Sequence, residues 1–261
     1  MTYMEDIQGE LKTRWLGRKY FHETELTSTN SFGYDLAEKG EPMGSVIVAD
    51  VQRAARGRKG RVWEAPEGGL WFSLLLRPAF TPREAASLTT VTAVGLCRGL
   101  MYYPGLGAEL QWPNDIYADG KKLGGILSEM KVEENKLAYA VIGVGINLSA
   151  AALSEELSEK AIGMEDILGE AVDKKELLCR LLLGLESAYD QYFQGQRELL
   201  FEEWRERSRI IGKNVTVKTV SGDVKGRPVG LAEDGFLLLD LGGGKGAKVI
   251  SGDLVIDDEI Q

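Results

Sequence analysis

The sequence predicts an α+β fold, in which helices pack on a mixed, largely antiparallel sheet and the C-terminal part forms a small β-barrel. Three observations carry this prediction. Strand-like and helix-like segments are mixed without strict β-α-β alternation, Asp119-Gly120 marks a tight hairpin turn, and from about residue 210 the chain changes to short strand-like runs separated by turns. We therefore expect two domains, formed by residues 1–209 and 210–261.

The N-terminal third is expected to contain strands and helices in turn. Residues 6–16 have the apolar spacing of a short amphipathic helix, which leads into a strand at 19–25. Thr27-Ser28-Thr29-Asn30 is rich in residues that cap helix N-termini, so a helix is predicted over 31–39. Apolar runs then predict buried strands at 45–51 and 70–77, and a long helix that Pro82 opens and that continues over 83–101.

The middle of the chain is expected to contain two antiparallel hairpins. The first turns at Asp119-Gly120, and the second turns at 133–135. Beyond them, residues 154–209 are predicted to be mostly helical. The strands expected here are 109–111, 125–131 and 136–148, and the clearest helices are 174–193 and 198–207.

Composition and charge restrict the possible functions. With 31 Lys and Arg against 40 Asp and Glu, the 261-residue chain has a formal net charge of −9 and 44% apolar residues, which is typical of a globular protein with a core. Such a negative field disfavours binding of nucleic acid across the whole surface, although a local basic site is compatible with it. The N-terminus lacks a basic region followed by an apolar core, so a cytoplasmic protein without a membrane partner is expected.

Cysteine and histidine are scarce. Cys97 and Cys179 are far apart and each lies in an apolar, helix-like stretch, and His22 is the single histidine. These residues argue against a disulfide framework, a thiolate metal cluster and a Ser-His-Asp triad. A reducing compartment therefore fits the sequence best.

The most unusual segment is the loop 53–63, which carries five positive charges in nine residues and no acid among them. Burial of such a run is very costly, so it is either a solvated loop or a site for an anion. Gly57 and Gly60 let the backbone approach a ligand closely, and guanidinium groups match carboxylates and phosphates. An RNA-binding patch is a further interpretation. The P-loop pattern does not occur in the sequence, so a nucleotide site would be of another design.

Trp112-Pro113-Asn114-Asp115 precedes the first hairpin. It is either a buried Trp-Pro pair with a turn, or it directs Asn114 and Asp115 toward a metal or a substrate amine. The return strand brings Lys122 alongside, where it is either solvated or a fixed cation facing a phosphoryl group, and Gly124-Gly125 leaves room for a ligand. Gly143 and Gly145 lie in a strand that by itself is typical of a core, but they admit a flat group.

Taken in order, these motifs resemble those of the biotin protein ligase family. The resemblance runs from about residue 20 to the end and includes the terminal barrel, which is similar to an SH3 barrel. It implies a biotin/lipoate ligase-like catalytic domain of the class II synthetase type. The motifs that carry it are Ser28-Thr29-Asn30, Gln52, Arg56-Gly57-Arg58-Lys59-Gly60-Arg61-x-Trp63, Gly68-Gly69-Leu70, Trp112-Pro113-Asn114-Asp115, Lys122-Leu123-Gly124-Gly125-Ile126-Leu127 and Gly143-x-Gly145-Ile146-Asn147.

The resemblance implies an enzyme that joins biotin to AMP from Mg·ATP, releases pyrophosphate, and then transfers biotin to one lysine of a carrier. The implied partner is a biotin carboxyl carrier protein, or the biotinyl domain of a biotin-dependent carboxylase or decarboxylase. A homodimer is a further expectation. The short segment before residue 20 lacks the winged-helix region of the family's repressor members, so DNA binding by that route is not expected.

The resemblance also implies roles for individual residues. The implied catalytic residues are Lys122, Arg58 and Asp115, of which Asp115 is also the implied ligand of Mg²⁺. The implied biotin-binding residues are Ser28, Thr29, Asn30, Gln52, Arg56, Gly57, Arg58, Lys122, Gly124 and Gly125. The implied ATP-binding residues are Arg56, Arg58, Arg61, Trp63, Asn114, Lys122 and Asn147. The loop is expected to be mobile until an acyl-adenylate orders it as a lid that excludes water.

Two residues depart from the family pattern. Ala55 stands where glycine is usual, which would restrict the loop if a positive φ were needed there, and Gln111 stands where lysine is usual, which removes a cation near the site. Two rival functions remain. One is a lipoate or octanoate ligase or transferase of the same fold, in which the Arg-rich glycine loop is not expected. The other is a non-enzymatic RNA-binding module that uses this loop.

Overall fold

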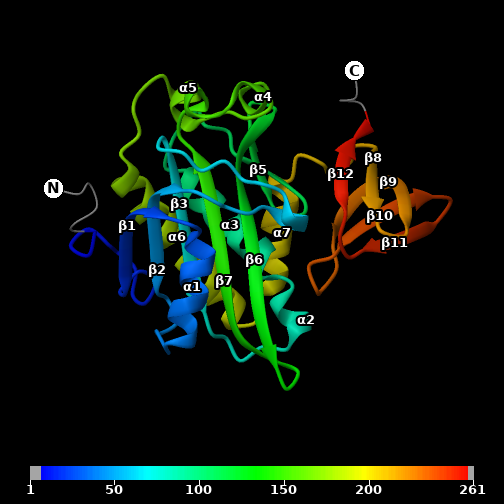
Figure 1. Ribbon diagram of the computed structural model, residues 1–261. Coiled ribbons are helices and arrows are strands. Elements are labelled where there is room, and N and C mark those ends of the chain that lie inside the picture. Colours follow the sequence, from blue (N-terminus) through cyan, green and yellow to red (C-terminus); the bar gives the residue numbers. More distant parts are fainter. Residues whose placement is uncertain (1–6, 258–261) are drawn as a thin grey trace.

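Seven strands form the large sheet of the computed structural model, which describes residues 7–257 (Figure 1). Their order is β1-β2-β3-β7-β6-β5-β4. β1 and β2 run parallel, and the other neighbours are antiparallel, as the sequence predicts. The strands are β1 (Tyr20–Leu26), β2 (Val46–Gln52), β3 (Gly69–Leu76), β4 (Glu109–Gln111), β5 (Asp115–Ala118), β6 (Lys121–Glu133) and β7 (Lys136–Asn147).

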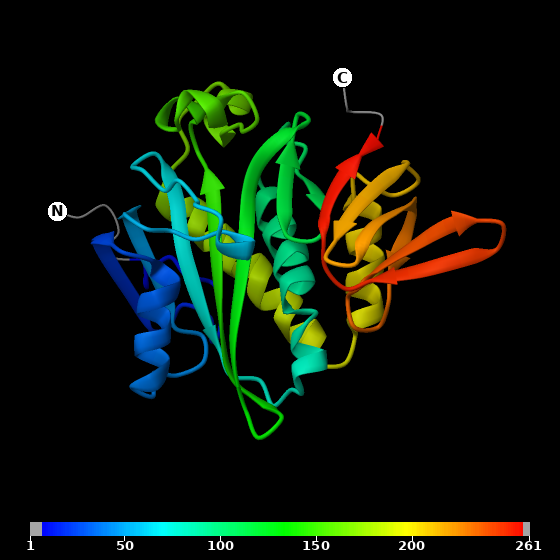
Figure 2. The same ribbon diagram turned by 45° about the vertical axis from the view of Figure 1, so that its right-hand side comes forward.

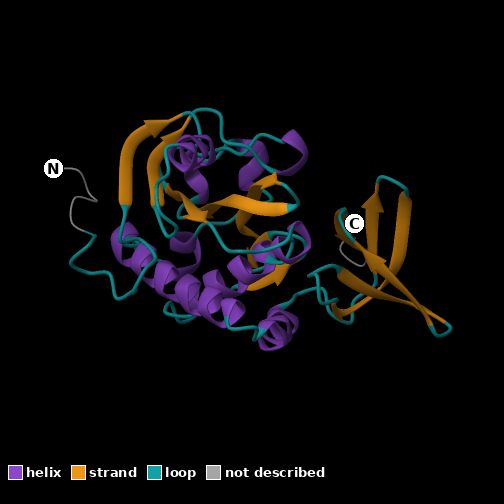
Figure 3. Cartoon of the chain, turned by 90° about the horizontal axis from the view of Figure 1, so that it is seen from below, coloured by secondary structure: helices purple, strands orange, loops and turns teal. Residues whose placement is uncertain are grey.

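Helices cover both faces of this sheet (Figures 1 and 3). α1 packs on β2, β3 and β7, whereas α3 and α6 pack together on the opposite face. Side chains of β3 alternate accordingly: Phe72 and Leu74 enter the main core, and Leu75 packs with α1. The helices are α1 (Thr29–Glu38), α2 (Pro82–Ala85), α3 (Leu88–Leu100), α4 (Glu155–Ser158), α5 (Met164–Leu168), α6 (Lys174–Phe193) and α7 (Arg197–Arg207), with short 3-10 turns at Arg58–Gly60 and Ala150–Ala152.

A second, smaller sheet follows α7. Its five antiparallel strands have the order β11-β10-β9-β8-β12, and β12 is the strand on the side of the large sheet (Figure 2). The α+β class with a separate C-terminal β unit is thereby confirmed. The strands are β8 (Val215–Thr219), β9 (Gly222–Leu231), β10 (Leu237–Gly242), β11 (Lys245–Val249) and β12 (Asp253–Ile256).

The helix predicted at 6–16 is wrong. Residues 7–19 form turns, and Asp6 lies outside the described residues. A carboxylate on α6 explains the difference, because Glu186 accepts the backbone N–H groups of Arg14, Trp15 and Leu16 at 2.7, 2.8 and 2.9 Å. A helix would have used these groups internally. The apolar pattern instead reflects burial of a turn-rich segment against α6.

The long helix predicted after Pro82 is divided into α2 and α3. Thr81 and Glu84 form a capping box around Pro82, as expected for a helix start. Past this first turn, the N–H groups of Ala86 and Ser87 donate to carbonyls three residues back. The tighter turn ends α2 before α3 begins.

The two predicted hairpins are confirmed, and they share β6 as their common strand. Asp119 and Gly120 have φ values of 48° and 72°, which is the left-handed geometry of a type I′ turn. Glu134 and Asn135 form the second turn with φ values of 47° and 60°. β6 begins directly after the first turn, as expected for the return strand of this hairpin, and it ends at Glu133, two residues beyond the predicted end.

Glycines allow α3 and α6 to cross at close range. A Cβ at Gly184 would lie 2.4 Å from the carbonyl oxygen of Gly95, and a Cβ at Gly99 would lie 2.7 Å from Cα of Leu181. Backbone atoms therefore meet where side chains usually separate helices. Within residues 7–257, no helix is long and apolar enough to cross a membrane.

Gly184→Ala should destabilise the protein by about 1–3 kcal/mol, because the added methyl group meets backbone that cannot turn aside. Urea unfolding followed by circular dichroism measures this. Leu183→Ala on the exposed side of α6 is the matched control, with an expected loss of about 0.5 kcal/mol or less. Equal stability of the two variants would contradict the close crossing.

Candidate active site

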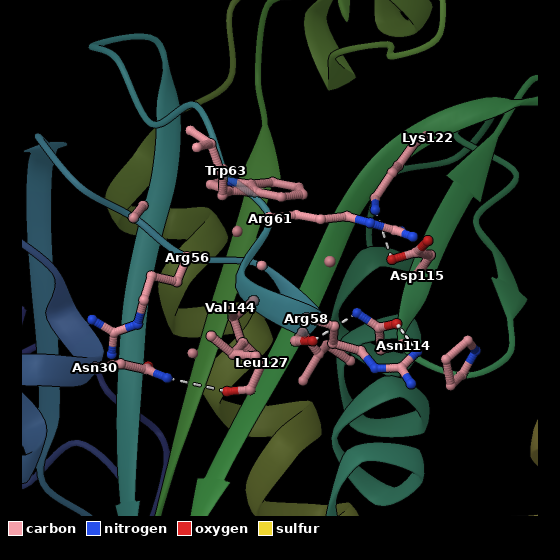
Figure 4. A pocket seen from close by; sticks show the side chains of 18 of the residues that line it. Asn30, Arg56, Arg58, Arg61, Trp63, Asn114, Asp115, Lys122, Leu127 and Val144 are labelled. Carbon is pink, nitrogen blue, oxygen red and sulfur yellow. Dashed lines mark hydrogen bonds and ion pairs between the residues drawn. The ribbon is translucent and has the colours of Figure 1, made fainter. Parts of the chain in front are cut away.

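A cavity of about 270 Å³ lies between the α1 side of the large sheet, the loop 53–63 and β12 (Figure 4). Uncharged polar side chains and Arg56, which lies beside Asn30, line the end near α1, and the other charged side chains gather near β5 and β6. The residues predicted from sequence that line it are Ser28, Thr29, Asn30, Gln52, Arg56, Gly57, Arg58, Arg61, Trp63, Asn114, Asp115, Lys122 and Gly125. The cavity thus gathers groups that are separated widely along the chain.

The uncharged end is built where α1 begins. Ser28 is the N-cap of α1, and its hydroxyl accepts the N–H of Ser31 at 3.4 Å. The parallel register places Leu26 of β1 opposite Gln52 of β2, so the residues that follow Leu26 come close to Gln52. The backbone N–H of Thr29 donates to Gln52 Oε1 at 2.7 Å, and Thr29 Oγ1 lies 3.1 Å from the same oxygen.

Each cation of the loop 53–63 meets a partner from another part of the chain. The contacts are Arg53 Nε to Glu25 Oε1 at 2.6 Å, Arg56 Nη2 to Glu129 Oε2 at 3.3 Å, Arg58 Nη1 to Asn114 Oδ1 at 3.2 Å, Lys59 Nζ to Asp253 Oδ2 at 3.1 Å, and Arg61 Nη2 to the same Asp253 oxygen at 2.6 Å. Repulsion within the loop predicts that it is mobile without a ligand. In the structure, acidic side chains from distant parts of the sequence offset much of this repulsion. The loop therefore has partners within the protein even when no ligand is bound.

Asp253, the first residue of β12, holds two loop cations at once. Burial by itself raises the pKa of this carboxyl, but Lys59 and Arg61 outweigh burial and lower the pKa below its ordinary value. Because the pKa is lowered in the folded protein, the stabilisation is present above about pH 4 and is lost as the pH falls through the lowered pKa. The loop therefore stays tied to the small sheet throughout the neutral range.

Arg58 lies deeper in the site than the other loop cations. Burial lowers the pKa of its guanidinium, while Asp253 and Asp115 act in the opposite direction. Its Nη1 donates to Asn114 Oδ1, and Asn114 Nδ2 donates to the carbonyl of Ile126 at 2.8 Å. An arginine remains charged under these conditions, so Arg58 is a fixed cation inside the cavity.

Lys122 and Asp115 confirm the predicted juxtaposition across the first hairpin. β5 and β6 pair so that Tyr117 lies opposite Lys122 and Asp115 lies opposite Gly125. Lys122 Nζ is 2.7 Å from Asp115 Oδ1, and it also lies 5.2 Å from the centre of the Trp63 ring. Figure 4 shows Arg61 directed toward this pair. An ammonium and a carboxylate are therefore held side by side at the charged end.

Trp63 covers the glycine-lined part of the sheet. A Cβ at Gly125 would lie 3.2 Å from its ring, and a Cβ at Gly145 would lie 2.9 Å from it. Of the two glycines predicted to admit a flat group, Gly145 is covered by the indole of the protein's own Trp63, whereas a Cβ at Gly143 would meet Asn30 Oδ1 at 2.4 Å. Its Nε1 is buried without a hydrogen-bond partner among the described residues.

Two predicted site residues do not line the cavity. Gly124 is buried between strands, where a Cβ would lie 2.5 Å from the carbonyl oxygen of Gly145. Asn147 is also buried, and its Nδ2 donates to the carbonyls of Lys122 and Ile162 at 3.4 Å each. In this arrangement Asn147 supports the backbone of Lys122.

The two departures from the family pattern have structural consequences. Ala55 is buried and is not among the residues with positive φ, so the alanine does not strain the loop. Gln111 Oε1 accepts from Arg209 Nη1 at 2.8 Å, and the Arg209 guanidinium lies 4.2 Å from the centre of the Tyr117 ring. A cation that follows α7 in the chain, Arg209, therefore stands behind the position where lysine is usual.

Sequence reasoning missed Asp253, Leu254 and Tyr117, which also line the cavity. Tyr117 could have been found, because it alternates with Asp115 along β5. No local signal marks Asp253, since the turn before β12 resembles the other turns of the small sheet. Within residues 7–257, no group of three or more His, Cys, Asp or Glu side chains is placed to hold a metal ion by itself.

Comparison with known proteins gives two family matches. Residues 21–147 match the family described as "Biotin/lipoate A/B protein ligase family". Residues 210–256 match the one described as "Biotin protein ligase C terminal domain". The first match includes the loop, the hairpins and α1, and the second includes the whole small sheet.

Individual relatives agree with these matches. A bifunctional ligase/repressor of Bacillus subtilis is 34% identical over 252 residues, which cover 95% of this chain and 77% of the relative. A biotin–[acetyl-CoA-carboxylase] ligase of Mycobacterium tuberculosis is 34% identical over 221 residues, covering 81% and 79%. The solved biotin protein ligase of Aquifex aeolicus in complex with biotin and ATP is similar with a TM-score of 0.78 and 28% identity, and the match covers 92% of this chain and 99% of that chain.

Asp253→Asn should loosen the loop 53–63, because Lys59 and Arg61 lose the charge that holds them. Trypsin cleavage after these two residues should become about 2- to 10-fold faster, since the ion pairs are partly exposed. Limited proteolysis with mass spectrometry identifies the sites. Asp223→Asn, an exposed change in β9 of the same sheet, is the control. Equal cleavage of both variants would show that Asp253 does not hold the loop.

Proposed function

The chain belongs to the biotin protein ligase family, and we infer from this that it activates biotin with ATP and transfers the biotinyl group to a lysine of a carrier protein. One observation of the site carries the assignment of residues. Lys122, Arg58, Arg61 and Asp115 converge at one end of the cavity, while the other end offers mostly uncharged hydrogen-bonding groups, with Arg56 beside them. An anionic acyl phosphate suits the first end, and the uncharged bicyclic head of biotin suits the second.

In the first step, a carboxylate oxygen of biotin attacks the α-phosphorus of ATP. The bond from that phosphorus to the β-phosphate oxygen breaks, and pyrophosphate leaves with the bonding electrons. Two anions must approach each other, so positive charge that is fixed beforehand lowers the barrier. We assign this role to Lys122 and Arg58, with Arg61 and Arg56 on the phosphates. Ion pairing to Asp115 and Glu129 keeps two of these cations in place before substrate arrives.

In the second step, the neutral amine of the carrier lysine attacks the acyl carbon of biotinyl-AMP. The bond from carbon to the phosphate oxygen breaks, AMP leaves, and the nitrogen loses a proton. We assign Asp115 as the group that orients the amine and receives this proton, directly or through water. Support comes from its place at 2.7 Å from Lys122 Nζ, because an ammonium already occupies the position that suits an amine.

Mg²⁺ is proposed to accompany ATP. Asp115 and Asp253 are the carboxylates that line the cavity, which fits a hard cation that takes most of its ligands from phosphate and water. Asp115 is the proposed protein ligand. Bound there, the ion would neutralise charge on the phosphates.

The proposed adenine contact is Trp63, whereas Asn147 does not line the cavity. Trp63 offers a ring face and a buried N–H that no described residue accepts, and both suit a flat, nitrogen-rich base. Asn147 is held behind Lys122, so we propose that it acts on ATP through the position of Lys122. Biotin-head contacts are assigned to Ser28, Thr29, Asn30 and Gln52, and Gly57 and Gly125 are proposed to line its path.

Neither rival function is favoured. The C-terminal match is to a biotin protein ligase domain, and a relative is named as a biotin–[acetyl-CoA-carboxylase] ligase. The RNA-binding alternative needs free positive charge, but acids of the same chain offset the loop. Residues 1–209 and 210–261 are proposed to act as two domains of this ligase.

The same proposal implies an acceptor protein and a subcellular location. The acceptor is proposed to be a biotin carboxyl carrier protein or an equivalent biotinyl domain. Cys97 and Cys179 are free thiols, which agrees with the proposed cytoplasmic location. A homodimer through a sheet edge also stays a prediction, with β1 and β4 as the outer strands of the large sheet.

Lys122→Ala should lower biotin-dependent exchange of pyrophosphate into ATP by about 30- to 1000-fold. This corresponds to about 2–4 kcal/mol for one fixed cation lost from the reacting centre. Lys121→Ala is the control, since this exposed neighbour begins the same strand outside the cavity. Thermal melting verifies that both variants fold. Unchanged exchange by folded Lys122→Ala would refute the role of this lysine.

A further inference from the structure

Arg209 is a buried cation in the short segment that connects α7 to β8. It is 8% exposed and does not itself line the cavity. Its backbone N–H donates to the carbonyl of Leu110 at 3.0 Å, and Ser208 forms a parallel bridge with the same residue. The segment after α7 is thereby attached to β4, the outer strand of the large sheet. Burial of a charge is costly, so a buried guanidinium is expected where other groups use its charge or its hydrogen bonds.

Two side chains of the cavity wall contact the Arg209 guanidinium. Its Nη1 donates to Gln111 Oε1 at 2.8 Å, and its central carbon lies 4.2 Å from the centre of the Tyr117 ring. Because a guanidinium can only donate, the oxygen of the Gln111 amide faces Arg209, and the nitrogen faces the Tyr117 hydroxyl at 3.5 Å. Gln111 and Tyr117 line the cavity and Arg209 does not, so one layer of side chains separates this charge from the cavity.

Strand pairing places this layer at the charged end of the cavity. Gln111 of β4 lies opposite Asp115 of β5, and Tyr117 of β5 lies opposite Lys122 of β6. All four side chains line the cavity. The Arg209 guanidinium therefore stands behind the end that holds the Lys122–Asp115 pair, and not behind the end near α1.

The charge of Arg209 adds to an excess of positive charge at this end. Three cations and two carboxylates line it among the described residues, and an arginine side chain remains charged in proteins. The amide and the phenol ring in between carry no charge, and solvent screens a buried charge less than an exposed one. The lining groups counted here are Arg58, Arg61 and Lys122 against Asp115 and Asp253.

We propose that Arg209 is a positioning residue that acts through Gln111 and Tyr117, where it orients both side chains and strengthens the attraction of the charged end for the phosphates of ATP. This inference rests on the proposed function, in which that end takes the phosphates. Attack of a carboxylate on the α-phosphorus redistributes negative charge without adding to it. A cation one layer behind the wall therefore attracts bound ATP and the transition state about equally, which lowers KM without raising kcat.

Arg209→Met removes the charge and keeps an unbranched side chain. In biotin-dependent pyrophosphate exchange, its KM for ATP should rise about 5- to 20-fold, while kcat stays within about 2-fold of the wild-type value. Loss of a group at the reacting centre would instead lower kcat. Arg205→Met is the matched control, because it removes the same charge from α7, where Arg205 pairs with Glu202 away from the cavity. Both kinetic constants should be unchanged in this control.

A charge swap at position 111 separates the effect of charge from an effect on packing. In Arg209→Met, the second change Gln111→Lys returns a cation to the cavity wall from β4, and KM for ATP should recover to within about 3-fold of wild type. In the wild-type background, Gln111→Lys brings an ammonium against the Arg209 guanidinium, so it should give no such gain and should lower the melting temperature. Loss of packing around Arg209 could not be reversed by a lysine on another strand.

The outcomes distinguish this inference from the proposed function. Unchanged KM for ATP in folded Arg209→Met overturns the role of Arg209, and so does a fall in kcat that Gln111→Lys does not reverse. If Arg209→Met does not fold, the double variant decides by itself: wild-type-like constants support the inference, and a raised KM overturns it. A wild-type protein without biotin-dependent exchange contradicts the proposed function itself.

Discussion

The constraint on which the rest of the structure depends is that the positive charges of the loop 53–63 must be offset by acidic side chains where the loop covers the cavity. Five cations in a short loop cannot be gathered above an apolar sheet unless other groups offset their repulsion. Glu129 from β6 and Asp253 from β12 supply much of that offset, so the large sheet and the small sheet both contribute to one site. The same cations are then available to a substrate that brings more negative charge than these acids provide.

The uncharged end of the cavity follows a different principle. Most of its groups are buried and hydrogen-bonded, and the amides of Gln52 and Asn30 are oriented by the backbone N–H of Thr29, which can only donate, and by the Glu129 carboxylate, which accepts. Glu129 stands behind this end, where it accepts from Asn30 and pairs with Arg56. One carboxylate therefore holds a residue of α1 and a cation of the loop 53–63 together.

Several features of the fold could be predicted from the sequence because local chemistry determines them. Asp119-Gly120 needs left-handed backbone for its turn, and Ser28 has the side chain that an N-cap requires. The pairing of Lys122 with Asp115 follows from the hairpin, since register brings them together. The family motifs also contain most of the residues that line the cavity, although the roles of these residues remain proposals.

Other features depend on groups far apart in the chain and had no local signal. Glu186 converts a segment with helical apolar spacing into turns by binding three of its N–H groups. Asp253 of β12 reaches the loop 53–63, and Arg209, which follows α7, stands behind Gln111. In each case a side chain on one element satisfies charges or backbone groups of another, and only the tertiary arrangement reveals the pairing.

The central claim is that the cavity joins biotin to AMP and keeps the product until an acceptor arrives. The most direct measurement is mass spectrometry of the purified protein after incubation with biotin and Mg·ATP in the absence of any carrier. The account predicts that biotinyl-AMP is retained by the protein and that an equimolar amount of pyrophosphate is released. Recovery of unchanged ATP, or of ADP and phosphate without biotinyl-AMP, would contradict it.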